Sequence, residues 1–487
     1  LNRCACHFAP RSRAASGCGM VFSDQVFVFF FLPIALLICL PTRRTRYFAV
    51  TIALSSLAFF YWESGSLTII LLFSIAMNYL GGLLLWKRKK HSVLVILIAA
   101  NLGLLAYFKY TAFTLGIFGF FGEPSIERYA AGIILPIGIS FYTFQGISYL
   151  IDVWRGDTSP ERNLITFTAY QSFFPQLIAG PIVRYADVKQ DLNNPITSVH
   201  LFAYGAARFL LGLCKKVLVA DTVAPIANAA FFSGQDLTFA SAWIGALAFT
   251  VQIYFDFSGY SDMAIGLAAM FGIRFKENFN HPYAASTITE FWRRWHISLS
   301  TWFRDYLYIP LGGNRLGERR TYVNLSIVFI LTGFWHGAAW TFVLWGAYHG
   351  AFLVFEKVFR IGRTPSTLLR FVYFFPITVI GWTLFQSPSL GRFTDFMQHM
   401  FAPFTSDALT LNSEMIVALS PQALLAFCVG FSALLVQGRY KPLGVFIQES
   451  GSSRAKFIRV IFIAGAALMA SIYVLPQDFS PFLYFRF

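Results

Sequence analysis

The sequence predicts an all-α, polytopic integral membrane protein. Of its 487 residues, 56% are hydrophobic and only 13% are charged, whereas a soluble protein carries about 25% charged residues. Apolar runs close to the roughly 20 residues that a helix needs to cross a bilayer recur along most of the chain. Some of these runs also contain ionisable residues, which at membrane depth usually mark a functional site.

We expect about 10–13 spanning or re-entrant helices in one compact bundle. Several of the apolar segments are short or interrupted by proline and glycine, and Val323–Val358 is long enough for two helices. The segments are Gln25–Pro41, Tyr47–Trp62, Leu67–Trp86, Ser92–Phe108, Ala130–Ile151, Leu164–Gly180, Leu201–Ala220, Ala240–Tyr254, Asp262–Ile273, Val323–Val358, Leu368–Phe385, Leu419–Leu435 and Phe457–Leu475.

The formal net charge of +15 does not by itself indicate nucleic-acid binding. The basic residues are dispersed among loops, with clusters at Arg43–Arg46 and Lys87–Lys90. Cytoplasmic loops of membrane proteins are rich in Lys and Arg, which are attracted to anionic lipids. We therefore expect anionic membrane lipids, and no nucleic acid, among the partners.

The first 19 residues differ from the rest of the chain. They contain three of the six cysteines, Cys4, Cys6 and Cys18, and this spacing fits no standard zinc site. We expect residues 1–19 to be an extension outside the functional protein and residues 20–487 to form a single transmembrane domain. The apolar run after Met20 lacks a small-residue cleavage site, so it is expected to remain as a helix.

Polar residues concentrate between positions 163 and 350, where they should face the bundle interior or a water-filled cavity. Two proline-containing stretches, Leu135–Tyr142 and Phe173–Pro181, predict helix breaks. Broken backbone is tolerated at membrane depth only where it is buried in protein or lines a cavity. The sequence therefore predicts a polar catalytic core at about 163–350.

His336 is the first candidate catalytic residue because it stands alone in an apolar run. A neutral imidazole takes a proton from a hydroxyl or thiol near pH 7, so histidine is a common general base. The alternative is a structural histidine. Gly333 and Gly337 flank His336, and we expect them to leave room for a ligand beside its ring.

His296, in the run FWRRWHISLS, is the second candidate. Helical periodicity places Trp292 and Trp295 on an apolar stripe and His296 on a more polar side. One interpretation is an interfacial helix whose arginines reach towards the membrane surface. The other is a helix that lines the site and brings His296 towards His336.

In the second interpretation Arg294 or Arg304 holds an anionic group. Asp305 would pair with Arg304 or orient a histidine, and simple pairing is the expectation. Asp256 and Asp262 project about 240° apart on a helix, so we expect interior hydrogen bonds and no carboxylate pair. We expect no metal site, because the histidines lack H-x₃-H spacing.

Four stretches resemble the membrane-bound O-acyltransferase (MBOAT) family, in particular its bacterial branch of alginate O-acetylation and teichoic acid D-alanyl transfer proteins. The resemblance extends from Met20 to the end of the chain and implies a helical bundle with a central funnel. The stretches are Phe173–Tyr185, Tyr254–Gly266, Phe291–Arg315 and Gly333–Gly350.

The resemblance implies that His336, in Trp-His-Gly, is the essential catalytic residue and that His296 is the second site residue. It also implies that Arg304 and Asp305 line the same site. The residues that we expect to line or support the channel are Arg294, Arg304, Asp305, Trp335 and Asp256.

The implied protein is a multi-pass acyltransferase of the bacterial inner membrane. It would pass an acetyl group from a cytoplasmic donor, acetyl-CoA or another acyl thioester, for O-acetylation of an exopolysaccharide such as alginate. No bound cofactor is expected. The expected partners are a periplasmic serine-hydrolase-like O-acetyltransferase and other polysaccharide-modification proteins.

Other acceptors remain open at this point: cellulose, peptidoglycan, teichoic acid and lipid. A transporter in which His336 relays protons is a further alternative. The sequence does not show the inverted repeat that such transporters often carry.

Overall fold

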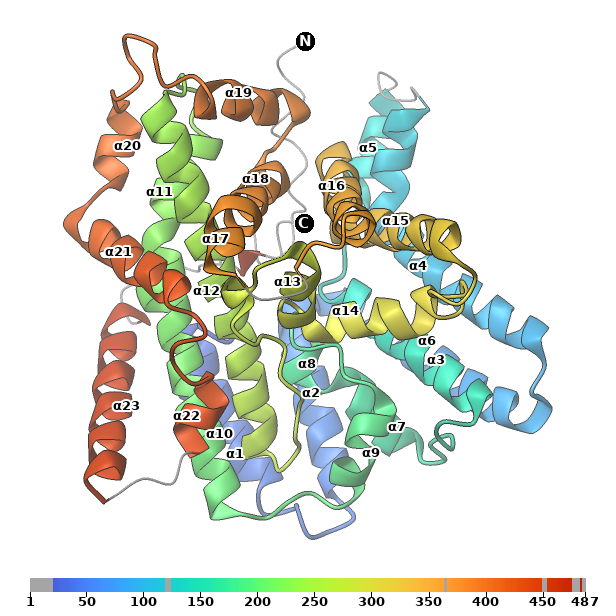
Figure 1. Ribbon diagram of the computed structural model, residues 1–487. Coiled ribbons are helices and arrows are strands. Elements are labelled where there is room, and N and C mark those ends of the chain that lie inside the picture. The colour runs from blue at the N-terminus through green and yellow to red at the C-terminus, as the bar shows by residue number, and fades with distance from the viewer. Residues whose placement is uncertain (1–20, 119–123, 363–365, 449–452, 475–481, 484–487) are drawn as a thin grey trace. The chain divides into compact units, whose positions relative to one another are not determined.

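The part of the chain that the structure describes is built from helices. The computed structural model describes residues 21–118, 124–362, 366–448, 453–474 and 482–483, and these contain no strand (Figure 1). The predicted all-α class is confirmed. Residues 1–19, predicted to be an extension, lie outside the described residues.

The chain divides into two compact units. The first comprises residues 1–210, 260–276 and 474–487, and the second comprises residues 211–259 and 277–473. Two of the boundaries between the units fall inside α10 (Val199–Cys214) and α12 (Phe239–Met270), one falls between residues 276 and 277, and one falls at the last residue of α23 (Ser453–Val474). The single domain expected for residues 20–487 stays a prediction.

In the first unit, α3 packs against α4 and α6, and α2 packs against α7. Besides parts of α10 and α12, the helices of this unit are a π-helical stretch at Phe27–Phe31, α1 (Leu32–Cys39), α2 (Phe48–Ser64), a 3₁₀ turn at Gly65–Leu67, α3 (Thr68–Arg88), α4 (His91–Ile117), α5 (Pro124–Gly132), α6 (Ile139–Arg155), α7 (Leu164–Ser172), α8 (Phe174–Leu177) and α9 (Tyr185–Asn193).

In the second unit, α16 packs against α15, α13 and α18. Its remaining helices are a π-helical stretch at Lys215–Ala220, α11 (Asp221–Phe231), a 3₁₀ turn at Pro282–Ala284, α13 (Ile288–Arg294), α14 (Ile297–Phe303), a π-helical stretch at Arg304–Tyr308, α15 (Glu318–His336), α16 (Trp340–Val358), α17 (Thr367–Leu369), a π-helical stretch at Arg370–Phe374, α18 (Phe375–Gln386), α19 (Leu390–Met400), α20 (Ser413–Ala418), α21 (Pro421–Leu435), α22 (Leu443–Gln448) and α23 (Ser453–Val474).

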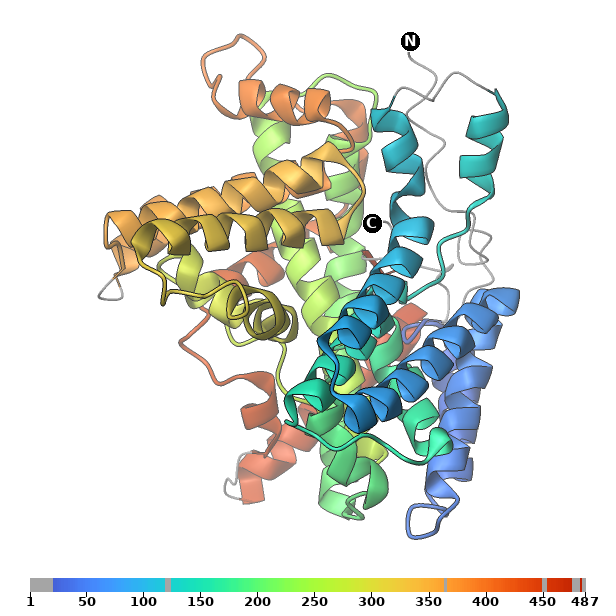
Figure 2. The same ribbon diagram turned by 90° about the vertical axis from the view of Figure 1, so that its right-hand side faces the viewer.

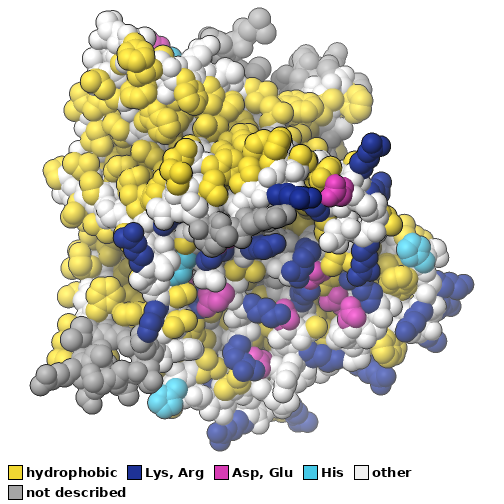
Figure 3. All heavy atoms as spheres, in the orientation of Figure 1, with side chains coloured by type: hydrophobic (Ala, Val, Ile, Leu, Met, Phe, Trp, Pro, Cys, Tyr) yellow, Lys and Arg dark blue, Asp and Glu magenta, His cyan; other side chains and the backbone are white. Residues whose placement is uncertain are grey.

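Within the described residues, three helical stretches are long and apolar enough to cross a membrane: Phe48–Arg88, His91–Ile117 and Thr367–Gln386. Large hydrophobic side chains such as Phe30 and Phe462 point outward, and Figure 3 shows apolar side chains over much of the face that it draws. Apolar exposure on this scale marks contact with a membrane or a partner. The chain is thus a membrane protein, and the expected 10–13 segments stay a prediction.

The helix breaks follow the sequence in most places. Helix α6 begins at Ile139, within the predicted break at Leu135–Tyr142, α7 ends at Ser172, and Val323–Val358 forms parts of two helices. The predicted separation of Ala240–Tyr254 from Asp262–Ile273 is wrong, because α12 runs through both. Gly259 lies between these two segments and packs closely: a Cβ there would lie 2.8 Å from the Gly212 carbonyl oxygen.

Helices α15 and α16 lie side by side as an antiparallel pair (Figures 1 and 2). A Cβ on Gly346 would lie 2.2 Å from the Phe329 carbonyl oxygen, and one on Gly333 would lie 2.2 Å from the Phe342 carbonyl oxygen. A Cβ on Gly337 would meet the Phe342 ring at 2.2 Å. The expectation that Gly333 and Gly337 leave room for a ligand is wrong, because the α16 backbone and the Phe342 ring fill that space.

The close approach of α15 and α16 should make Gly346→Ala destabilising by about 1–3 kcal/mol, since the added methyl group forces the helices apart. The measurement is thermal unfolding of the detergent-solubilised protein. Gly465→Ala in α23 is the matched control, because a Cβ there meets no atom within 4 Å. Equal melting temperatures for the two variants would contradict this account of the helix pair.

Candidate active site

The chain breaks between α13 and α14, at the histidine of FWRRWHISLS. His296 has φ 44° and ψ 54°, in the left-handed region, and α14 begins at the next residue. The prediction of one continuous amphipathic helix here is wrong. The reason is Asn278: its carbonyl accepts the Ile297 N–H at 2.9 Å, and its side-chain oxygen accepts the Ser298 N–H at 3.1 Å. These bonds replace those that a continuous helix would make.

Two carboxylates, those of Glu356 and Glu290, anchor α13, the helix that ends before His296. Glu356 of α16 is buried and accepts the N–H groups of Ile288 and Thr289 at 2.5 and 2.8 Å. A negative charge at the start of a helix is favourable because the free N–H groups and the helix dipole both attract it. This contact ties α13 to α16.

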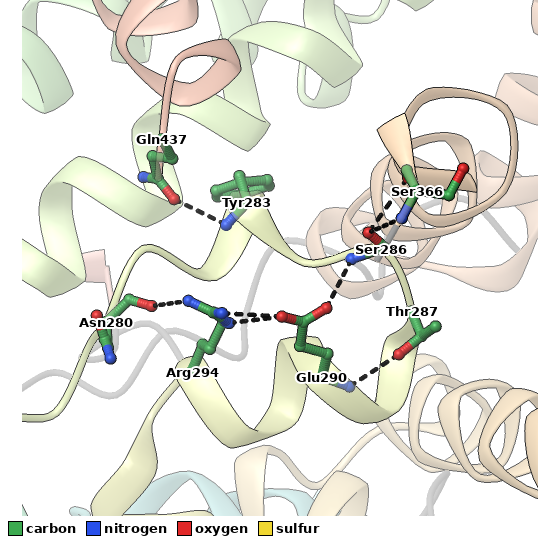
Figure 4. Close-up of polar contacts among 8 residues, drawn as sticks. All are labelled: Asn280, Tyr283, Ser286, Thr287, Glu290, Arg294, Ser366 and Gln437. Atoms are coloured by element: carbon green, nitrogen blue, oxygen red, sulfur yellow. Dashed lines mark hydrogen bonds and ion pairs between the residues drawn. The ribbon is translucent and has the colours of Figure 1, made fainter. Parts of the chain in front are cut away.

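Glu290 organises the other side of α13 (Figure 4). Its carboxylate accepts the Ser286 N–H at 3.0 Å and binds Arg294 at 2.8 and 3.1 Å. Arg294 also donates to the Asn280 carbonyl at 3.2 Å. The structure thus shows Arg294 holding α13 to the preceding loop, and its expected role with an anionic group stays a prediction.

The contacts of His296 define which ring nitrogen carries the proton. Because Asn278 accepts the Ser298 N–H, the acceptor must be its side-chain oxygen. The same oxygen lies 3.2 Å from Nδ1 of His296, which must therefore be the donor. Burial lowers the pKa of His296 to about 3, so the ring is neutral and its Nε2 carries a lone pair.

One tryptophan contacts both candidate histidines. The Trp335 ring centre lies 6.5 Å from that of His296 and 5.0 Å from that of His336. His296 is 0% exposed and His336 is 4% exposed. The structure therefore brings the two histidines and Trp335 together, which agrees with the second of the two interpretations of His296.

Aromatic rings enclose His336, the last residue of α15. Trp345 lies 5.1 Å away with the two ring planes at 90°, and Phe385 lies 5.5 Å away. Phe257 packs edge-on against His296 at 4.6 Å. An apolar environment of this kind excludes water, which strengthens polar interactions with a reacting group.

Arg304 and Asp305 form an ion pair with each other, as predicted. Two bonds join them, at 2.6 and 3.1 Å, and the Arg304 side chain is 60% exposed. They belong to the π-helical stretch that follows α14. That they line the catalytic site stays a prediction.

Asp256 binds a buried lysine. Its carboxylate lies 2.7 Å from Lys216 Nζ, and Asp221 lies 2.6 Å from the same atom. Asp262, in the first unit, binds Arg208 instead, at 2.7 and 3.0 Å. The expectation that Asp256 and Asp262 form no carboxylate pair is confirmed, and Asp256 neutralises a buried cation.

His349 is a buried histidine near the candidate site that the sequence analysis did not select. It is buried in α16, and its ring contacts Trp345 at 5.0 Å and Trp292 at 5.3 Å. Neither of its ring nitrogens has a hydrogen-bond partner among the described residues. Trp345 thus lies between His336 and His349. The signal in the sequence was a second histidine on the helix that follows Trp-His-Gly.

Comparisons with known proteins identify the family. The model of the MBOAT, membrane-bound O-acyltransferase family matches residues 159–390, a range that includes both candidate histidines. The probable alginate O-acetylase AlgI of Azotobacter vinelandii is 42% identical, over 96% of this chain and 100% of that protein. The corresponding protein of Pseudomonas putida is 41% identical over the same shares.

A more distant relative is the peptidoglycan O-acetyltransferase of Helicobacter pylori, 34% identical over 76% of this chain and 78% of that protein. The chain belongs to the membrane-bound O-acyltransferase family, as its sequence motifs indicated, and it is an acyltransferase.

The Asn278–His296 contact generates a prediction about activity. Asn278→Ala should lower the acyl-transfer rate about tenfold or more, because His296 loses the acceptor that fixes its proton on Nδ1. Ser298→Ala is the matched control: it removes a hydroxyl that lies 2.9 Å from the Asn278 side-chain oxygen and 3.4 Å from His296 Nδ1, and it leaves the Asn278–His296 contact in place. Rates are measured at equal amounts of folded membrane protein. Equal rates for the two variants would show that the tautomer of His296 has no part in the reaction.

Proposed function

We propose that the protein is an O-acetyltransferase of the bacterial inner membrane that supplies acetyl groups for O-acetylation of an exopolysaccharide, with alginate as the first choice. The observation that carries this proposal is the pair of buried histidines on either side of Trp335, within the family's matched range. The names of the Azotobacter vinelandii and Pseudomonas putida relatives support the acetyl group and the polymer.

In the proposed reaction His336 acts as the general base. Its imidazole takes the proton of the accepting hydroxyl, and the resulting oxygen attacks the thioester carbonyl. An acetyl–oxygen bond forms, the acetyl–sulfur bond breaks, and the proton passes from the imidazolium to the departing thiolate. The aromatic enclosure around His336 keeps out water that would otherwise hydrolyse the thioester.

In this scheme His296 acts as a hydrogen-bond acceptor and does not serve as the general base. With Nδ1–H bound to Asn278, its Nε2 accepts hydrogen bonds and does not donate them. It is therefore suited to hold an amide N–H of the donor or the hydroxyl of the acceptor. A neutral ring in this tautomer is not suited to stabilise an oxyanion.

The proposed donor is a cytoplasmic acyl thioester, acetyl-CoA or a related compound. The proposed acceptor on the outer side is a periplasmic serine-hydrolase-like partner, which transfers the acetyl group to the polymer together with other polysaccharide-modification proteins. Buried polar residues within a membrane protein suit a reaction whose donor and acceptor lie on opposite sides of the bilayer.

The test is the acetyl content of the exopolysaccharide in cells that carry wild type, His336→Ala or His296→Ala. We expect His336→Ala to remove at least about nine-tenths of the acetyl groups, in keeping with loss of a general base. His200→Ala is the control, because that histidine is exposed. Membrane levels of each variant are compared by immunoblot.

Polymer that stays fully acetylated with His336→Ala at normal protein levels would rule out this function. Acetyl content would then be measured in peptidoglycan, since the Helicobacter pylori relative is a peptidoglycan O-acetyltransferase.

A further inference from the structure

The proposed reaction needs hydrogen-bond donors for the thioester carbonyl oxygen. When the accepting oxygen attacks the carbonyl carbon, an electron pair of the C=O double bond moves to the carbonyl oxygen and makes it an oxyanion. Enzymes bind such an oxygen with donors that are already in place. In the roles given above, His296 offers a lone pair at Nε2 and His336 serves as the base. The donors must therefore come from other residues around His336.

Trp345 of α16 carries the first such donor. Its ring centre lies 5.1 Å from that of His336, and the residue is 1% exposed. The indole Nε1–H has no hydrogen-bond acceptor among the described residues. Buried N–H groups are normally satisfied, and a buried N–H without an acceptor is unfavourable. An acceptor that arrives with the substrate would satisfy this one.

Gln386, the last residue of α18, carries the second donor. It is 4% exposed, and its side-chain Nε2 has no acceptor in the part of the chain that the structure describes. The preceding residue, Phe385, contacts both His336, at 5.5 Å, and Trp345, at 5.2 Å. Trp382, one helical turn before Gln386, stacks on Trp345 at 6.0 Å. Because residues four apart share one face of a helix, Gln386 lies on the side of α18 that faces Trp345.

Two neighbouring residues have similar polar atoms but a less suitable position. Trp292 Nε1 and both ring nitrogens of His349 also lack partners among the described residues. Trp292 and His349 contact each other and the Trp345 ring, whereas Trp345 itself contacts His336. We therefore assign the donor role to Trp345 and Gln386. Neither carries a charge, and aromatic rings surround them, which suits a carbonyl oxygen better than a phosphate or carboxylate.

We propose that the Nε1–H of Trp345 and the Nε2–H of Gln386 bind the thioester carbonyl oxygen of the acetyl donor and stabilise its oxyanion. The inference rests on the proposed function, because it adds two catalytic residues to that reaction. As the acetyl–oxygen bond forms, negative charge passes to the carbonyl oxygen, where the two donors hold it. The C=O double bond then re-forms, the acetyl–sulfur bond breaks, and the departing thiolate takes the proton from the His336 imidazolium.

The first experiment compares binding of acetyl-CoA and S-ethyl-CoA to the purified full-length protein in phosphatidylcholine nanodiscs. S-ethyl-CoA has a methylene group in place of the acetyl carbonyl and is otherwise identical. We expect wild type to bind acetyl-CoA about tenfold more tightly, the effect of one or two hydrogen bonds. Trp345→Phe and Gln386→Met should each reduce this preference to about threefold or less. Methionine keeps the length of the glutamine side chain and removes its amide.

Trp243→Phe is the matched control. The indole N–H of Trp243 already donates to the Met400 carbonyl oxygen at 3.0 Å, so its loss should leave the preference for acetyl-CoA unchanged. Thermal unfolding gives a second contrast. Trp243→Phe leaves a carbonyl without its donor and should lower the melting temperature, whereas Gln386→Met removes a donor that has no acceptor and should not lower it.

The second experiment measures the acetyl content of the exopolysaccharide in cells that carry each variant at equal membrane levels. Removal of one oxyanion donor lowers a rate about 100-fold or more. We therefore expect Gln386→Met to leave less than about one-tenth of the acetyl groups, and Trp243→Phe to leave the wild-type content.

Equal affinity of wild type for the two probes, or a wild type that binds neither, overturns the inference. So does a preference that both variants retain, a preference that is lost while the polymer stays fully acetylated, or a melting temperature that Gln386→Met lowers as much as Trp243→Phe does. If Trp345→Phe fails to fold, Gln386→Met carries the test. Failure of the proposed function is seen separately, as exopolysaccharide acetylation that survives His336→Ala.

Discussion

The contact between the backbones of α15 and α16 is the constraint on which the candidate site depends. Gly333 and Gly346 place each helix against carbonyl oxygens of the other, at a distance that any Cβ would prevent. Because the two helices are joined by only a few residues, this contact fixes the end of α15, where Trp335 and His336 lie. It also fixes Trp345, whose ring lies between His336 and His349.

A second set of contacts brings the other histidine to the same place. Glu356 of α16 accepts hydrogen bonds from the first N–H groups of α13. Asn278 accepts the Ser298 N–H and so ends the helix before His296. The left-handed conformation of His296 is unfavourable by itself, so these bonds must compensate for it. The result is a neutral imidazole with a defined tautomer beside Trp335. The strained backbone at His296 therefore accompanies a ring whose Nε2 carries a lone pair that can accept a hydrogen bond from a substrate.

Much of the site was predictable because its residue types are unusual in their surroundings. A lone histidine in an apolar run and a histidine beside arginines both indicated function, and the structure places both rings against Trp335. The pairing of Arg304 with Asp305 followed from their adjacency. The break at His296 was not predictable from periodicity, because the competing hydrogen bonds come from Asn278, which lies outside that run. His349 was missed because the sequence does not show that its ring packs against Trp345, which also contacts His336.

The sequence by itself determined the helical class, the membrane environment and the family, because hydrophobic content, segment length and local motifs are properties of the chain. It also determined which histidines to consider. Only the tertiary structure decided that Gly333 and Gly337 bring protein surfaces together, that Arg294 is bound to Glu290, and that His296 presents a lone pair at Nε2. The physical reason is that each of these depends on atoms from segments distant in sequence, whose approach is set by packing and by the need to satisfy buried polar groups.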